Sequence, residues 1–172
     1  APPELTVRAL VVGGLIGSVV AVTNVNTGLK TGFWESGCVL SSLLAFGGLS
    51  ALARRGTPVS PLETNLAQTA AVSVGAMPAS VGLLGMVPAL AILGTPQPPG
   101  WALALWGVGL GTLGVLFAFS LRRRLLEDEA LPFPTGAAAA ELISRLHSTG
   151  SAYAARVRGL WVSGLASMTL TF

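Results

Sequence analysis

Residues 62–94 read LETNLAQTAAVSVGAMPASVGLLGMVPALAILG, an apolar stretch whose only charge is Glu63 near its start. An α-helix rises about 1.5 Å per residue, and the hydrocarbon core of a bilayer is about 30 Å thick. The stretch is therefore too long for one straight transmembrane helix. Pro78 and Pro88 would each remove a helical hydrogen bond and kink or end the helix. We predict a broken or re-entrant transmembrane element here.

The chain around this stretch is poor in charge. Of its 172 residues, 52% are hydrophobic and 10% are charged, and the mean hydropathy is +0.72. Soluble domains carry about 25% charged residues, so this chain cannot cover a water-facing surface and a bilayer is its expected solvent. The net charge of +3 comes from bases at the ends of apolar runs, which is typical of membrane proteins. We therefore expect membrane lipid as a partner and no nucleic acid.

The apolar runs predict an all-α, polytopic helical membrane protein with about four transmembrane spans and the start of a fifth. A signal peptide is the competing interpretation of the first run, although no small-residue cleavage site follows it. Together the runs form one membrane-embedded region over residues 1–172. The predicted spans are residues 5–29, 33–53, the broken 62–94 and 101–121, with a partial span at 157–172.

Residues 136–148 predict a short amphipathic helix at the membrane surface. A charged and proline-punctuated segment precedes this helix. Leu142, Ile143 and Leu146 fall on one helical face, as expected for a helix that lies along an interface. His147 lies off that face, and we expect it on the surface.

The basic residues predict the orientation of the chain. If the N-terminus is cytoplasmic and residues 62–94 make one net crossing, nine arginines fall on the cytoplasmic side and Lys30 falls outside. Cytoplasmic loops of membrane proteins carry an excess of Lys and Arg, so this arrangement is favoured. Helical spans further indicate a bacterial inner (plasma) membrane. The nine arginines are Arg8, Arg54, Arg55, Arg122, Arg123, Arg124, Arg145, Arg156 and Arg158.

Polar side chains gather at three places in the apolar runs. Such groups are costly in a membrane and usually face a bundle interior or a water-filled cavity. The first cluster ends the first run, the second is Glu35, and the third opens the broken stretch with Glu63. We expect Lys30 to attract a carboxylate and Glu35 or Glu63 to carry a coupling proton. The candidate substrate-binding residues are Asn24, Asn26, Lys30, Asn65, Gln68 and Thr69.

The third cluster has helical spacing. Asn65, Gln68 and Thr69 stand at i, i+3 and i+4, which places them on one face of a helix. Amides offer both donors and acceptors, which suits peptide bonds and carboxylates. Structural alternatives stay open for these candidates. Lys30 could reach lipid headgroups, and Glu63 could stabilise a helix N-terminus. Asn65 and Gln68 could instead join helices by hydrogen bonds.

Some chemical classes are excluded by composition. One cysteine, Cys38, and one histidine cannot form an ordinary His/Cys metal cluster or an intrachain disulfide, so we predict no metal and no cofactor. Cys38 is expected to act as a small apolar helix residue. The chain contains no GxSxG, HExxH or P-loop motif, so we do not expect an enzyme.

Glycines at four-residue spacing recur along the apolar runs. Such spacing lets helix backbones approach closely, so we expect tight helix packing at these places. The alternative is chance, because the chain holds 22 glycines. The pairs are Gly13 and Gly17, Gly28 and Gly32, and Gly107 and Gly111.

Four stretches of this chain occur in a recognisable order. They are PELTVRALVVGGLIG (3–17), NVNTGLKTG (24–32), LETNLAQTAA (62–71) and LPFPTGAAAAELI (131–143). Taken together they resemble the N-terminal part of the oligopeptide transporter (OPT) family. The second is similar to its Asn-x-x-x-Gly-Leu-Lys-Thr-Gly signature. The third resembles its Leu-Glu-Asn-Asn-x-x-Gln-Thr-Ala stretch, where Thr64 replaces one of the two amides.

The resemblance implies proton-coupled uptake of small oligopeptides or peptide-like metal chelates by alternating access. It also implies an all-helical fold several-fold longer than this chain, so we expect an N-terminal fragment whose partners include the missing C-terminal part. Peptide and chelate transporters share these motifs, so the choice between the two substrates stays open. The alternatives are a small membrane scaffold or assembly subunit and an oligomeric pore.

Overall fold

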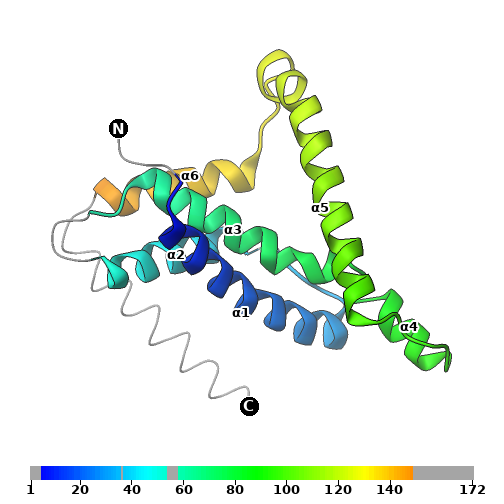
Figure 1. The fold of residues 1–172 in the computed structure, drawn as a ribbon. Coiled ribbons are helices and arrows are strands. Elements are labelled where there is room, and N and C mark those ends of the chain that lie inside the picture. The colour runs from blue at the N-terminus through cyan, green and yellow to red at the C-terminus, as the bar shows by residue number, and fades with distance from the viewer. Residues whose placement is uncertain (1–4, 36, 54–57, 149–172) are drawn as a thin grey trace. The chain divides into compact units, whose positions relative to one another are not determined.

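Figure 1 shows the computed structural model, which describes residues 5–35, 37–53 and 58–148. The regular elements within these ranges are helices, which confirms the all-α prediction. The predicted partial span at residues 157–172 lies outside the described residues. The elements are α1 (Val7–Thr31), α2 (Cys38–Leu52), α3 (Pro61–Ser80), α4 (Met86–Ile92), α5 (Gly100–Arg123), the π-helical turn η1 (Arg124–Asp128) and α6 (Pro134–Ser148).

The long apolar stretch that contains Pro78 and Pro88 is divided between α3 and α4, so the predicted break is present. Pro78 lies in the last turn of α3, and Pro88 lies in the first turn of α4, where a missing N–H costs little. The turn at residues 81–85 separates the two helices. Whether this element makes one net crossing of the membrane stays a prediction.

Two helices of the described residues are long and apolar enough to cross a bilayer. They are α1 and the continuous helix Gly100–Asp128, which joins α5 to η1. α2 is apolar but has only 15 residues, which corresponds to about 22 Å of helix. α3 has 20 residues and carries the predicted polar row in its first turns. The topology of the second and third predicted spans therefore stays a prediction.

The chain forms two compact units, and α1 and α3 each contribute to both. Among the described residues, the first unit takes in 5–16, 38–53, 58–71 and 135–148. Its core consists of small and branched apolar side chains from α1, α2 and α3, which exclude water from the helix contacts. Close approach of helices requires small residues, and three of the five core residues are alanines. The core residues are Ala9, Val12, Ala45, Leu49 and Ala67.

α6 begins at Pro134, a residue that favours the first helical position, and from Thr135 on it belongs to the first unit. Ile143 and Leu146 are buried, so the apolar face of this helix packs on the protein. His147 differs from the sequence expectation. It is half-buried, because its ring packs edge-on against Phe46 of α2 with the ring centroids 5.0 Å apart.

Among the described residues, the second unit takes in 17–35, 37 and 72–134. Its helices approach closely at glycines. A Cβ atom added at Gly28 would lie 2.9 Å from Leu84 Cδ2, and one at Gly107 would lie 3.0 Å from Val81 Cγ1. In the first unit a Cβ at Gly13 would lie 2.5 Å from the Ala67 carbonyl oxygen. One glycine of each predicted pair therefore permits close packing.

Candidate functional site

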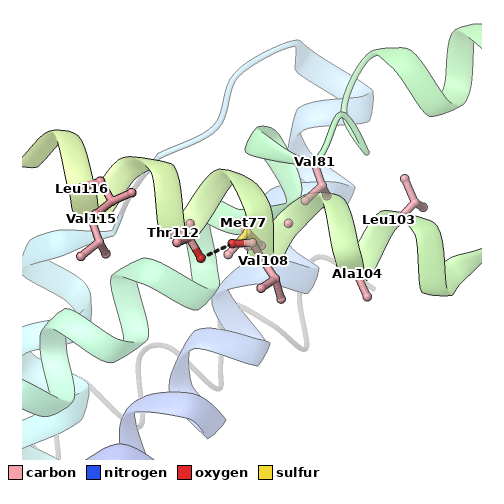
Figure 2. A pocket seen from close by; sticks show the side chains of 10 residues that line it. Met77, Val81, Leu103, Ala104, Val108, Thr112, Val115 and Leu116 are labelled. Atoms are coloured by element: carbon pink, nitrogen blue, oxygen red, sulfur yellow. Dashed lines mark hydrogen bonds between the residues drawn. The ribbon is translucent and has the colours of Figure 1, made fainter.

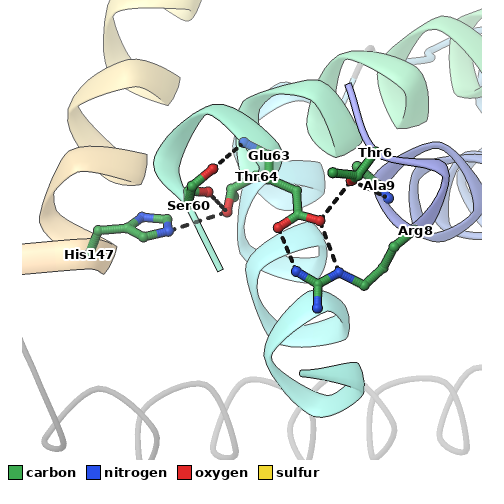
Figure 3. Close-up of polar contacts among 7 residues, drawn as sticks. All are labelled: Thr6, Arg8, Ala9, Ser60, Glu63, Thr64 and His147. Atoms are coloured by element: carbon green, nitrogen blue, oxygen red, sulfur yellow. Dashed lines mark hydrogen bonds and ion pairs between the residues drawn. The ribbon is translucent and has the colours of Figure 1, made fainter. Parts of the chain in front are cut away.

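Glu63, a predicted proton carrier, is buried at the start of α3 with 3% of its surface exposed. Arg8 of α1 binds its carboxylate twice, from Nε to Oε1 at 2.9 Å and from Nη2 to Oε2 at 2.6 Å. Thr6 Oγ1 donates a third bond to Oε1 at 2.7 Å (Figure 3). Bidentate arginine–carboxylate pairs are among the strong hydrogen-bonded contacts of proteins. A proton on Glu63 would have to displace these partners.

The local sequence explains how Glu63 reaches this position. Ser60 precedes Pro61, and its hydroxyl accepts a hydrogen bond from the Glu63 N–H at 3.0 Å. Ser is a preferred N-cap residue and Pro suits the first helical position, so α3 begins here. Sequence reasoning missed the roles of Arg8 and Thr6. In the sequence Arg8 indicates only membrane orientation, and the capping pattern around Ser60 does not indicate which residue pairs with Glu63.

The predicted polar row of α3 is divided by the structure. Gln68 is buried, and its Nε2 donates to Cys38 Sγ of α2 at 3.1 Å. Asn65 and Thr69 are exposed in this chain. Gln68 therefore joins two helices, which is the structural alternative that its sequence position left open. Cys38 begins α2 and accepts this bond, so its sulfur does more than fill apolar space.

His147 also reaches α3. Its Nε2 lies 3.4 Å from Thr64 Oγ1, while its Nδ1 lies 2.8 Å from the Ile143 carbonyl oxygen within α6. Thr64 Oγ1 itself donates to the Ser60 carbonyl oxygen at 3.1 Å. The histidine thus links α6 to the start of α3, next to Glu63 in sequence (Figure 3).

Asn24 is the buried member of the first polar cluster, with 8% of its surface exposed. Its Nδ2 donates to the backbone carbonyl of Glu35 at 2.8 Å and to that of Gly75 in α3 at 3.0 Å. Its Oδ1 accepts from the Glu35 N–H at 3.4 Å. The amide therefore binds backbone groups in this structure. Asn26, Lys30 and the side chain of Glu35 are exposed.

An apolar cavity of about 660 Å³ lies between α3 and α5 in the second unit (Figure 2). Its one hydroxyl group, on Thr112, donates to the Val108 carbonyl oxygen at 2.8 Å. None of the predicted substrate-binding residues lines it. The cavity therefore suits apolar groups rather than the polar candidates. Its lining residues are Met77, Val81, Leu103, Ala104, Gly107, Val108, Gly111, Thr112, Val115 and Leu116.

Within the described ranges, no three His, Cys, Asp or Glu side chains gather in a way that could hold a metal ion. The two predicted carboxylates have different surroundings. Glu63 is buried in an ion pair, whereas the Glu35 side chain is exposed. The structure therefore separates a fixed carboxylate from an accessible one.

Comparison with known proteins gives a consistent result. The family model described as OPT oligopeptide transporter protein matches residues 4–172. A protein of Saccharomyces cerevisiae described as a "Putative oligopeptide transporter" is 34% identical over 161 residues, which is 85% of this chain and 22% of the relative. A protein of Haemophilus influenzae with the same description is 41% identical over 83 residues, or 48% of this chain and 13% of the relative.

The chain thus spans about a fifth of the length of its yeast relative. No solved structure matches the chain. The family match covers nearly all of the sequence and confirms the resemblance that the four motifs indicated. The family consists of integral membrane transporters. This chain belongs to the OPT oligopeptide transporter family.

Proposed function

We propose that the chain is part of a proton-coupled secondary transporter for small oligopeptides or peptide-like metal chelates that works by alternating access. Its family supports transport across a membrane. The observation that carries the proposal is the group of exposed polar residues around the end of α1, where Lys30 and Glu35 present opposite charges. Peptides and peptide-like chelates carry carboxylates, amines and amides, so such a group offers complementary partners.

We assign the substrate contact to Asn26 and Lys30 and the coupling proton to Glu35. All three side chains are exposed and lie within the second unit. Lys30 supplies a positive charge for a substrate carboxylate, and Asn26 supplies an amide. Within the described residues the Glu35 carboxylate is exposed and makes no ion pair.

Glu63 has a different role in this proposal. Its carboxylate is buried and bound to Arg8, so its contacts favour the fixing of α1 to α3 over proton transfer. Asn65 and Thr69 of α3 are exposed and remain a second set of proposed substrate contacts. Gln68 supports this set through its bond to α2.

The break between α3 and α4 is the proposed hinge of alternating access. Transporters often use discontinuous helices at their substrate sites, because the interrupted backbone can bind ligands and move. The arginine distribution supports a cytoplasmic N-terminus, and a bacterial inner membrane is the proposed location.

The test is uptake by the full reading frame that contains this chain, reconstituted in lipid vesicles. A labelled tripeptide and a peptide-like metal chelate are offered with and without an inward proton gradient. We expect the gradient to raise uptake of one of them. Lys30→Ala should raise KM about ten- to a hundredfold, because a charge-assisted hydrogen bond contributes about 1.5–3 kcal/mol.

Glu35→Gln should remove the stimulation by the gradient but preserve exchange of substrate across the membrane. The matched control is Glu141→Gln, which changes an exposed carboxylate of α6 that is paired with Arg145. Uptake by the unmodified protein that is the same with and without the proton gradient would contradict proton coupling. Stimulation that survives Glu35→Gln and disappears in Glu63→Gln would move the proton to Glu63.

A further inference from the structure

Asn24 differs from the other polar residues at the end of α1 in the use of its side chain. An asparagine amide has two donor hydrogens and one acceptor oxygen. Both donors are taken by backbone carbonyls, those of Glu35 and Gly75, and the oxygen accepts the Glu35 N–H. The amide has no donor hydrogen left for a substrate carbonyl or carboxylate.

The Glu35 backbone is bound on both its N–H and its C=O by this one side chain. The segment around Glu35 joins α1 to α2 and begins and ends near glycines at positive φ, Gly32 at 72° and Gly37 at 67°. Glycine populates such angles readily and gives the backbone many alternative conformations. A connection of this kind therefore needs a contact from another segment to hold one conformation. Asn24 supplies that contact.

The second attachment point of Asn24 lies on α3. Glycine at position 75 permits this close approach of α3 to α1, because a Cβ atom there would lie only 2.7 Å from Val20 Cγ1 of α1. The absence of a side chain brings the α3 backbone within reach of the Asn24 amide. Gly75 stands one turn before Pro78, which is followed by the break between α3 and α4.

We propose that Asn24 is a positioning residue that ties the Glu35 segment to the part of α3 that precedes the break. Glu35 and this part of α3 then move together when the transporter changes state. The consequence for transport rests on the proposed function, in which Glu35 carries the proton. Asn24 contacts no substrate in this arrangement, and its loss uncouples proton movement from the helix.

The structural half of the proposal is tested on the 172-residue chain in lipid nanodiscs. A spin label is attached at Glu35→Cys in a Cys38→Ser background. The hydrogen bonds from Asn24 to residue 35 should persist after this change, because Asn24 binds the backbone of residue 35 and not its side chain. The label should be restrained with Asn24 present. Asn24→Asp should release it, because the isosteric carboxylate loses both donors and faces two carbonyl oxygens.

The matched control is Val22→Ala, an exposed position on the same helix. A second label at Ser144→Cys on α6 reports whether the first unit is still folded. Gly75→Ala, which crowds Val20 and shifts the bound carbonyl, should release the Glu35 label in the same direction as Asn24→Asp. An unchanged spectrum at position 35 in both Asn24→Asp and Gly75→Ala would overturn the proposal.

The transport half is tested in the full reading frame in vesicles. Asn24→Asp should keep the substrate KM within about twofold, since a tenfold change corresponds to about 1.4 kcal/mol of lost contact. It should also remove most of the stimulation by a proton gradient. A large rise in KM with intact stimulation would make Asn24 a substrate contact instead. Absence of any transport by the unmodified protein would remove the proposed function, while the spin-label result would still decide the positioning role.

Discussion

Glu63 in the first unit and Asn24 in the second are both buried polar residues at helix contacts, yet they are held by different kinds of partner. Glu63 is bound by side chains, the guanidinium of Arg8 and the hydroxyl of Thr6. Asn24 is bound by backbone groups of Glu35 and Gly75. A charged side-chain partner can be removed by one substitution, whereas a backbone carbonyl stays in the chain and can only be displaced by a substitution such as Gly75→Ala.

The difference separates two roles for polar residues in an apolar chain. A buried charge is stable only while its countercharge is present, so the loss of Arg8 alone should remove the whole stabilisation of Glu63. A buried amide makes neutral hydrogen bonds that can be lost one at a time, and the loss of each one costs less free energy than the loss of a countercharge. We therefore expect the first contact to control the stability of the unit and the second to control the position of one segment.

The largest effect is expected from Arg8→Ala. This change leaves the Glu63 carboxylate buried without its countercharge, which should lower the free energy of unfolding by about 3 kcal/mol. Thermal or denaturant unfolding in detergent, followed by circular dichroism, measures it. The control Glu141→Gln breaks an exposed pair and should cost less than about 1 kcal/mol. Arg8→Met combined with Glu63→Met should recover much of the loss, and equal effects of Arg8→Ala and Glu141→Gln would contradict the comparison.

Two glycine substitutions test how tightly each unit is packed. A methyl group at Gly13 would meet the Ala67 carbonyl oxygen, which is backbone and cannot turn away, whereas one at Gly75 meets the Val20 side chain. Gly13→Ala should therefore destabilise the protein by about 1–3 kcal/mol, and Gly75→Ala by less. Gly14→Ala meets nothing within 4 Å and should be neutral or stabilising. The same unfolding measurement ranks the three, and a loss in Gly14→Ala equal to that in Gly13→Ala would show that packing is not the cause.

Asn24→Ala is expected to cost about 1–2 kcal/mol, because it leaves two backbone carbonyls and one N–H without this partner. The effect should be smaller than that of Arg8→Ala in the same unfolding measurement. Asn26→Ala, two residues along and exposed, is the matched control and should change stability by less than about 0.5 kcal/mol. A cost for Asn24→Ala above that for Arg8→Ala would reverse the comparison.

The smallest effect is expected from Thr6→Val. The valine keeps the shape of the threonine but loses the bond from Oγ1 to the Glu63 carboxylate and the bond that Oγ1 accepts from the Ala9 N–H. We expect a cost of about 1 kcal/mol. Thr112→Val, whose hydroxyl bonds only within α5, is a suitable control. A loss as large as that in Arg8→Ala would mean that the hydroxyl, and not the ion pair, holds Glu63.

The sequence predicted the helical class, the break before α4 and the family, because each rests on local composition or on short motifs. It did not predict the partner of Glu63. Arg8 is 55 residues away in the chain, and no pattern within one helix indicates which helices meet. The polar residues themselves were identified by their cost in an apolar chain.

The residues of the candidate site could be selected from the sequence, but their geometry could not. Gln68 and Asn65 shared one predicted face, yet only Gln68 is buried against α2. His147 was expected on the surface because it lies off the apolar face of its helix, but Phe46 of another helix covers it. In each case the deciding contact comes from a distant segment, which periodicity does not report.

The pairing of Arg8 with Glu63 also has a consequence for synthesis. Arg8 emerges from the ribosome about 55 residues before Glu63 does, and chains grow at about 5–20 residues per second. For roughly 3–11 seconds, the guanidinium must be accommodated by water or lipid headgroups. The start of α1 can take its final place only after α3 has been made, so the ion pair sets an order of assembly for the first unit.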